Sequence, residues 1–257
     1  MLRWSIPLFR VFGIPLSLHP SFLLLLAYWA DQGWEEEGWH GAGWITAMLL
    51  GFFVCVVLHE LGHCLTARRF GIGTRRILLL PIGGMADLEE IPRQPSREIL
   101  MTLAGPAVNF VIAGVLWLVV RTFPDDVPLY SSSGLLAMLF SWNLVMGCFN
   151  LLPVFPMDGG RILRALLATR LPYVRATFWA ATVAKALAVL GVITALAAPK
   201  FHLTAQPLYL PAVLFTFIFV MGEMEYRFVK RRELEAEHWR NWWGRQQTVT
   251  VLDESPP

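Results

Sequence analysis

Long apolar stretches separated by short charged connections dominate the chain of 257 residues. A helix that crosses the hydrocarbon core of a bilayer needs about 20 mostly apolar residues. Six stretches qualify, and we expect each to be a membrane span: residues 16–31, 43–69, 98–121, 134–152, 174–198 and 207–229. The chain is 56% hydrophobic and only 16% charged, whereas soluble domains are about 25% charged. The pattern predicts an all-α polytopic membrane protein with six transmembrane helices.

The fourth stretch is interrupted by Pro153 and Pro156. Proline cannot donate a backbone hydrogen bond and restricts the residue before it, so a helix should end here. Irregular backbone at membrane depth is tolerated only where protein or a watery cavity surrounds it. We therefore predict a broken fourth helix that restarts at Arg161, with residues 150–160 forming one wall of a site.

Residues 76–88 are apolar but too short and too interrupted to cross a membrane. β-prone residues surround the pair Gly83 and Gly84, which predicts a small β-hairpin at the cytoplasmic face. Its free edge could pair with an extended peptide. The alternative is an interfacial loop that only covers the spans.

Basic residues fall in alternate connections between the predicted spans. Arginines follow the second and fourth stretches, whereas Glu35–Glu37 follow the first stretch and Asp125–Asp126 follow the third. Because basic loops mark the cytoplasmic side, we expect both termini to be cytoplasmic. We expect a transmembrane core of residues 1–229 and a charged, Trp-rich cytoplasmic tail of residues 230–257. The net charge of +2 gives no reason to expect a nucleic-acid partner.

The second stretch contains His59-Glu60-Leu61-Gly62-His63. Residues four apart lie on one face of a helix, so both imidazoles can reach one Zn²⁺ ion. Glu60 stands beside them as a base that can activate water. An ionisable residue in the middle of a membrane helix costs about 2.5–3.5 kcal/mol on insertion scales and is usually functional. The pattern therefore predicts a metal site inside the membrane.

A third protein ligand is expected, because catalytic zinc usually has three protein ligands and one open position. Asp158 follows the proline-broken segment and is our preferred third ligand. Glu89 and Glu90 are the alternatives, but they lie in a loop beside basic residues, where solvent can hydrate them. Binding of zinc would offset the high cost of a buried carboxylate at residue 158.

Two motifs, His59 to His63 and Asn150 to Arg161, together resemble the site-2 protease family of intramembrane zinc metalloproteases. The resemblance extends over residues 104–109 and the glycine pair of the hairpin. It implies one Zn²⁺ per chain, held by His59, His63 and Asp158, with Glu60 as the catalytic acid and base. It also implies that Asn150 positions substrate or stabilises the oxyanion.

Gly105 and Asn109 would line the site by the same resemblance, with plain helix packing as the alternative. His19, before the first span, is expected to cap the helix or lie at the interface. No segment resembles the regulatory modules that often accompany this family, so we expect a minimal member. Its substrate would be a membrane-tethered regulatory protein whose transmembrane helix unwinds locally within the lipid bilayer of a prokaryotic plasma membrane.

Two other classes of protein remain compatible with the sequence. A membrane transporter also uses buried polar groups at broken helices, but it more often has interrupted spans in both halves. A catalytically silent membrane adaptor could keep the motif without turnover. Zinc analysis combined with a cleavage assay separates the three.

Overall fold

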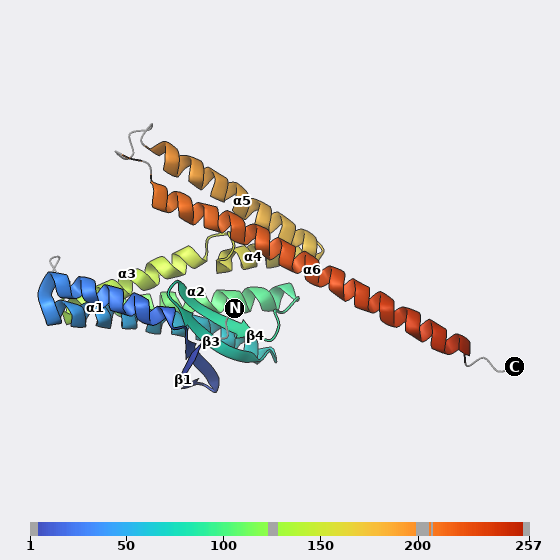
Figure 1. Cartoon of the computed structure of the whole chain (residues 1–257), viewed down its shortest axis with the longest axis horizontal. Helices are drawn as coiled ribbons and strands as arrows, with labels where there is room; N and C mark the ends of the chain where they lie inside the picture. Colours follow the sequence, from blue (N-terminus) through green and yellow to red (C-terminus); the bar gives the residue numbers. More distant parts are fainter. Residues whose placement is uncertain (1–4, 123–127, 199–205, 207, 254–257) are drawn as a thin grey trace. The chain divides into compact units, whose positions relative to one another are not determined.

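The computed structural model describes residues 5–122, 128–198, 206 and 208–253, with side chains up to residue 243. The described chain is mostly helical and contains one four-stranded sheet (Figure 1). It divides into two compact units, Met1–Leu152 and Pro153–Pro257.

The first unit is built around α1, Ser21–Arg69, a helix of 49 residues with a sharp kink. Glu37 and Gly38 have non-helical backbone angles, and Gly38 has a φ of 58°, which glycine adopts without strain. The two arms on either side of the kink contain the first two predicted spans. Phe22 and Phe53, one from each arm, stack edge to face at 4.5 Å, so the arms pack side by side.

Helices α2, Pro95–Val120, and α3, Ser132–Asn150, complete the helical part of this unit. Small residues allow them to approach α1 closely. A Cβ atom at Gly62 would lie 2.6 Å from the backbone oxygen of Ala104. Any larger residue would clash there, so glycine allows the two helices to approach. Close backbone approach at small residues is typical of helix packing inside membranes.

The sheet contains β1, Ile6–Val11, β2, Ile14–Leu18, β3, Thr74–Leu80, and β4, Gly83–Leu88, in that spatial order. The outer pairs are antiparallel and the central pair is parallel. The predicted hairpin is present as β3 and β4, but residues 6–18 enlarge it to a sheet that we did not predict. Alternate residues of β2 are buried against α1, so the first predicted span begins at Ser21 rather than at residue 16.

The second unit contains α4, Asp158–Ala168, α5, Tyr173–Ala197, and α6, Tyr209–Asp253. Helical structure stops at Asn150 and resumes at Asp158, three residues before the predicted restart. The break in the fourth helix is therefore confirmed. Small buried residues of α5, including Ala184 and Ala188, pack against Ile218 of α6. Helix α6 continues into the predicted tail as far as Asp253.

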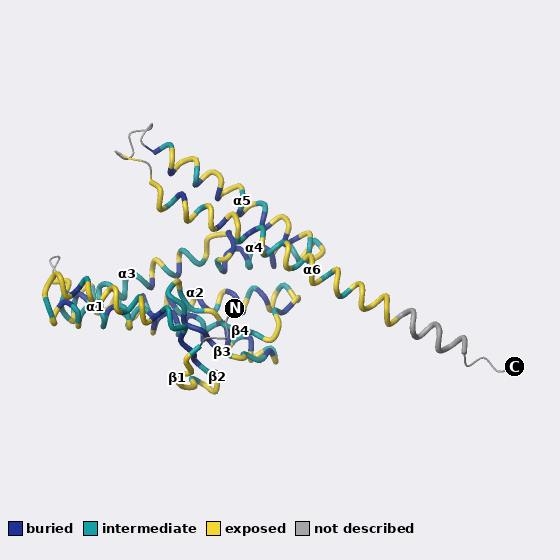
Figure 2. The backbone as a smooth tube through the Cα atoms, in the orientation of Figure 1, coloured by how far each residue is buried: buried dark blue, intermediate teal, exposed yellow. Residues whose placement is uncertain are grey.

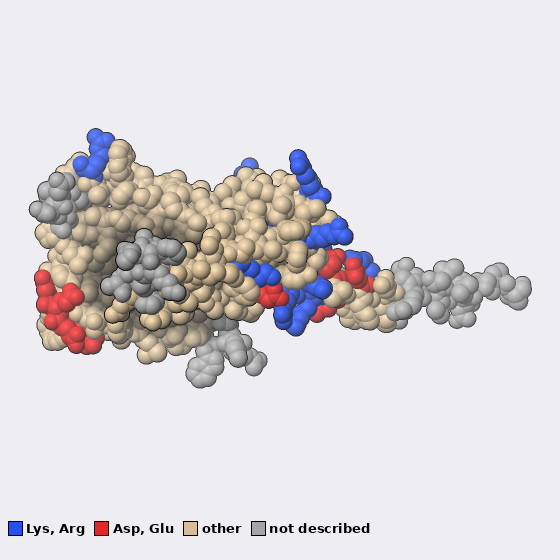
Figure 3. Space-filling view, turned by 90° about the horizontal axis from the view of Figure 1, so that it is seen from above, with Lys and Arg blue, Asp and Glu red and all other residues tan. Residues whose placement is uncertain are grey.

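Four described helices are long and apolar enough to cross a membrane: α1, α2, α3 and α5. They contain most of the first five predicted stretches, and α6 contains most of the sixth. Many residues of these helices are exposed (Figure 2), and large apolar side chains such as Val111, Val115 and Leu118 are among them. Uncharged side chains cover most of the face drawn in Figure 3. Such surfaces suit lipid rather than water, as expected for an integral membrane protein.

Candidate metal centre

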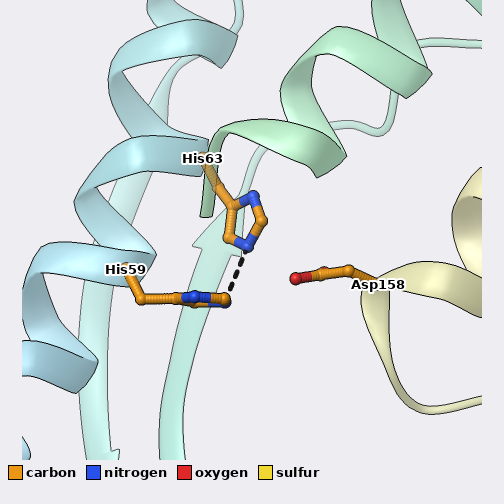
Figure 4. Close-up of side chains that lie close together, drawn as sticks. All are labelled: His59, His63 and Asp158. Atoms are coloured by element: carbon orange, nitrogen blue, oxygen red, sulfur yellow. Dashed lines mark hydrogen bonds between the residues drawn. The ribbon is translucent and has the colours of Figure 1, made fainter. Parts of the chain in front are cut away.

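His59 and His63 lie on consecutive turns of the second arm of α1 and are 5% and 8% exposed. Their Nε2 atoms are 3.1 Å apart, and the two rings meet at 86° (Figure 4). The helix therefore directs both imidazoles to one point, as the spacing of four residues predicts.

The hydrogen bonds on the far side of each ring fix which nitrogen carries the proton. Nδ1 of His63 lies 2.8 Å from the backbone oxygen of Met101, and Nδ1 of His59 lies 2.5 Å from Oδ1 of Asn109. Carbonyl oxygens only accept hydrogen bonds, so each Nδ1 donates and each Nε2 presents a lone pair. The two Nε2 atoms are 3.1 Å apart, so both lone pairs can be directed at one cation. The donor set therefore fits a metal ion bound through Nε2.

Gly105 of α2 provides the space that the two rings occupy. A Cβ atom at this position would lie 2.3 Å from Nε2 of His63 and 2.8 Å from Cε1 of His59. Gly105 and Asn109 are four residues apart on α2, so one face of that helix both makes room for the imidazoles and hydrogen-bonds one of them. The structure thus places both of these residues against the histidines.

Glu60 points to the sheet rather than to lipid. Its Oε2 accepts a hydrogen bond of 3.1 Å from the backbone N–H of Ala86 in β4. A Cβ atom at Gly84 would lie only 2.7 Å from Cγ of Glu60, so the glycine allows the strand to approach the carboxylate. The candidate base is therefore held beside β4, an edge strand of the sheet.

Asp158 is the first residue of α4 and is 7% exposed. Figure 4 draws it with His59 and His63, and each of the three buried side chains can offer one ligand atom to a metal ion. Glu89 and Glu90, the alternative ligands, are exposed. Asn150 is the last residue of α3, and its Nδ2 donates to the backbone oxygen of Met146 at 3.0 Å.

Two contributors to the centre were missed by the sequence reasoning. One is the backbone oxygen of Met101, which no side-chain pattern reveals. The other is Asn143 of α3, whose Oδ1 accepts a hydrogen bond of 2.9 Å from Nδ2 of Asn109. Asn143 is an amide in the middle of an apolar stretch, and that was a signal that could have found it.

Comparison with known proteins gives consistent matches. The model of peptidase family M50 matches residues 47–133 and 125–193, together more than half of the chain. A zinc metalloprotease of Methanocaldococcus jannaschii is 38% identical over 229 residues, which are 89% of this chain and 62% of the relative. A relative from Synechocystis is also 38% identical, over 61% of this chain and 42% of its own length. This chain thus spans less than two thirds of either relative.

The solved structure of a site-2 protease from Methanocaldococcus jannaschii is 35% identical to this chain. The two structures superpose with a TM-score of 0.59. The match covers 87% of this chain and 95% of the solved chain. The fold of this chain therefore resembles that of a solved site-2 protease over most of its length.

Proposed function

This chain belongs to peptidase family M50, and from that premise we propose that it is an intramembrane zinc metalloprotease of the site-2 type. It hydrolyses a peptide bond in or near the transmembrane segment of a membrane-tethered regulatory protein. The observation that carries the proposal is the pair of Nε2 atoms 3.1 Å apart, both with lone pairs directed at the same point. This pair lies inside a helix apolar enough to span a membrane.

His59, His63 and Asp158 hold the zinc ion in this proposal. Two neutral imidazoles and one carboxylate are a donor set that zinc enzymes use, and they leave a fourth position open. Bound zinc would supply Lewis acidity, which lowers the pKa of water and polarises the scissile carbonyl group.

Glu60 performs the proton transfers. Its carboxylate takes a proton from water as the water oxygen bonds to the carbonyl carbon. It then delivers that proton to the amine nitrogen as the C–N bond breaks, so the carboxylate is regenerated. The Ala86 N–H holds the carboxylate in place without itself being acidic enough to protonate it. Asn150 keeps one N–H that its bond to Met146 does not use, and this N–H would stabilise the oxyanion.

The substrate must be extended at the site of cleavage, because a helical peptide bond is shielded by its own hydrogen bonds. Strand β4 is the last strand of the sheet and lies beside Glu60. An unwound substrate segment that pairs with this edge would bring its backbone next to the base. The substrate class is therefore a membrane protein whose helix unwinds easily.

The proposed topology follows from the charge pattern. Six spans, formed by residues 1–229 with the two arms of α1 counted separately, would leave both termini on the cytoplasmic side of a prokaryotic plasma membrane. The tail of residues 230–257 would continue α6 into the cytoplasm. Trp239, Trp242 and Trp243 on this helix favour a position near the lipid headgroups.

The proposed function predicts that Glu60→Gln abolishes cleavage but keeps zinc. General acid–base groups contribute about 10²–10⁴-fold to rate, so a loss of that size is expected. The assay uses the full chain in detergent micelles and a single-span peptide with Gly-Pro in its apolar segment. Zinc is measured by elemental analysis of the same samples.

Asp158→Ala is the companion variant and is expected to lose zinc as well as activity. Cleavage by Glu60→Gln at the wild-type rate would exclude this mechanism. A wild-type chain that binds zinc but cuts no membrane peptide would favour the silent adaptor, and a chain without zinc would favour the transporter.

A further inference from the structure

Asn143 of α3 is completely buried. It does not contact His59 directly but is connected to it through the side chain of Asn109. We propose that Asn143 is a positioning residue for the metal centre, which fixes the protonation of His59 through the side chain of Asn109. The proposal rests on the proposed zinc site and extends it to a third helix.

The network starts from an acceptor that cannot rotate. The backbone oxygen of Leu139 accepts a hydrogen bond of 2.8 Å from Nδ2 of Asn143. A backbone carbonyl within a helix cannot exchange its donor and acceptor roles, so it fixes the orientation of the Asn143 amide. Nδ2 of Asn143 also lies 3.1 Å from Sγ of Cys55, which favours the same orientation.

Each following group is then determined by the one before it. Oδ1 of Asn143 accepts from Nδ2 of Asn109 at 2.9 Å, so Oδ1 of Asn109 must face His59. That oxygen accepts from Nδ1 of His59 at 2.5 Å, which keeps the proton on Nδ1 and the lone pair on Nε2. If the Asn109 amide were flipped, its NH₂ group would face Nδ1 and place the proton on Nε2. That tautomer cannot bind a metal through Nε2.

The cost of a flipped amide is large in this environment. Asn109 and Asn143 are both 0% exposed, so bulk solvent does not reach their side chains. Unsatisfied polar groups are most costly in a medium of low dielectric constant, so a complete network strongly favours one orientation. Residues that orient metal-binding histidines typically change metal affinity by about 10–100-fold when substituted.

The first test measures zinc affinity of the full-length protein in detergent by competition with a chelator. Asn143→Leu should bind zinc about 10-fold more weakly than wild type. Leu144→Ala is the matched control, because Leu144 is the next residue of α3 and its side chain is 40% exposed and makes no hydrogen bond. Its zinc affinity should equal that of wild type. An Asn143→Leu protein with wild-type affinity would overturn the proposal.

Asn143→Asp tests rescue if the leucine variant does not fold. A protonated aspartic acid can donate to Leu139 and accept from Asn109, so its zinc affinity should stay within about threefold of wild type. A loss as large as that expected for Asn143→Leu would count against the proposal.

The Asn109→Asp background separates positioning from a general structural role. A carboxylate has two accepting oxygens, so its rotation cannot present a donor to His59. Asn143→Leu should therefore weaken zinc binding in the wild-type background but not in the Asn109→Asp background. An equal loss in both backgrounds would show a structural role only. A wild-type protein that binds no zinc would instead refute the proposed function.

Discussion

The two units of this chain bury polar side chains in different ways. In the second unit, Nη1 of Arg164 contacts Oε1 of Glu225 at 2.5 Å, and the guanidinium also lies over the rings of Phe155 and Tyr173. The completely buried guanidinium of Arg164 is thus paired with an opposite charge from the protein. In the first unit, neutral imidazoles and amides form a network that ends in two lone pairs facing one another.

The difference distinguishes a structural polar cluster from a functional one. The ion pair of α4 and α6 is compensated within the protein, so it needs no ligand to be stable. The network of the histidine pair ends in two Nε2 atoms 3.1 Å apart that can both bind one cation, so it forms a candidate binding site. Both units bury polar side chains. The two clusters differ because Arg164 is paired with a carboxylate, whereas the histidine pair ends in nitrogen atoms that can bind a metal ion.

The largest expected effect tests the compensated cluster. Arg164→Leu should lower the free energy of unfolding by about 3 kcal/mol, because Glu225 would lose the partner that offsets its desolvation. The double variant Arg164→Leu/Glu225→Leu should recover most of that loss. Unfolding is followed by tryptophan fluorescence in mixed micelles, with and without a zinc chelator.

The loss for Arg164→Leu should be the same in both conditions if this cluster is purely structural. Arg227→Ala is the control, because Arg227 is 68% exposed and Glu223 keeps Lys185 as a partner at 2.9 Å. Exposed pairs contribute about 0–1 kcal/mol. A loss for Arg227→Ala as large as that for Arg164→Leu would contradict the comparison.

A smaller effect is expected for Gly105→Ala in the histidine cluster. The new Cβ atom would overlap Nε2 of His63, and overpacking costs about 1–3 kcal/mol. Zinc affinity should fall by about 10–100-fold, as measured by chelator competition. Gly114→Ala on the same helix is the matched control, since no atom lies within 4 Å of its Cβ position. Equal zinc affinities for the two variants would show that Gly105 does not shape the site.

The smallest effect concerns an exposed contact outside the spans. The hydrogen bond from Tyr130 to Glu36 raises the pKa of Tyr130 to about 12. A raised pKa stabilises the protonated, folded form, so this contribution is complete below pH 10, the ordinary pKa, and is lost as the pH rises through about 12. Tyrosinate absorbance should show a late-titrating group that disappears in Tyr130→Phe, with zinc affinity unchanged. Titration of that group near pH 10 would contradict the assignment.

The helical stretches and the helix break could be predicted because they depend on local properties of the chain. Apolar stretches of about 20 residues define spans without knowledge of their neighbours. Pro153 and Pro156 end a helix wherever they occur. Residues 6–18 were missed as strands because a parallel pair, here β2 with β3, joins segments about 60 residues apart. No local pattern reveals such a pairing.

The candidate site shows the same division. Spacing along one helix brings His59 and His63 together, so the sequence by itself determined that pair and the acid beside it. Only the tertiary structure decided which groups accept hydrogen bonds from the Nδ1 atoms of the two histidines. Met101, Asn109 and Asn143, which form that network, come from other helices. Helix geometry is a property of the backbone, whereas the protonation of an imidazole depends on the acceptors that packing places next to it.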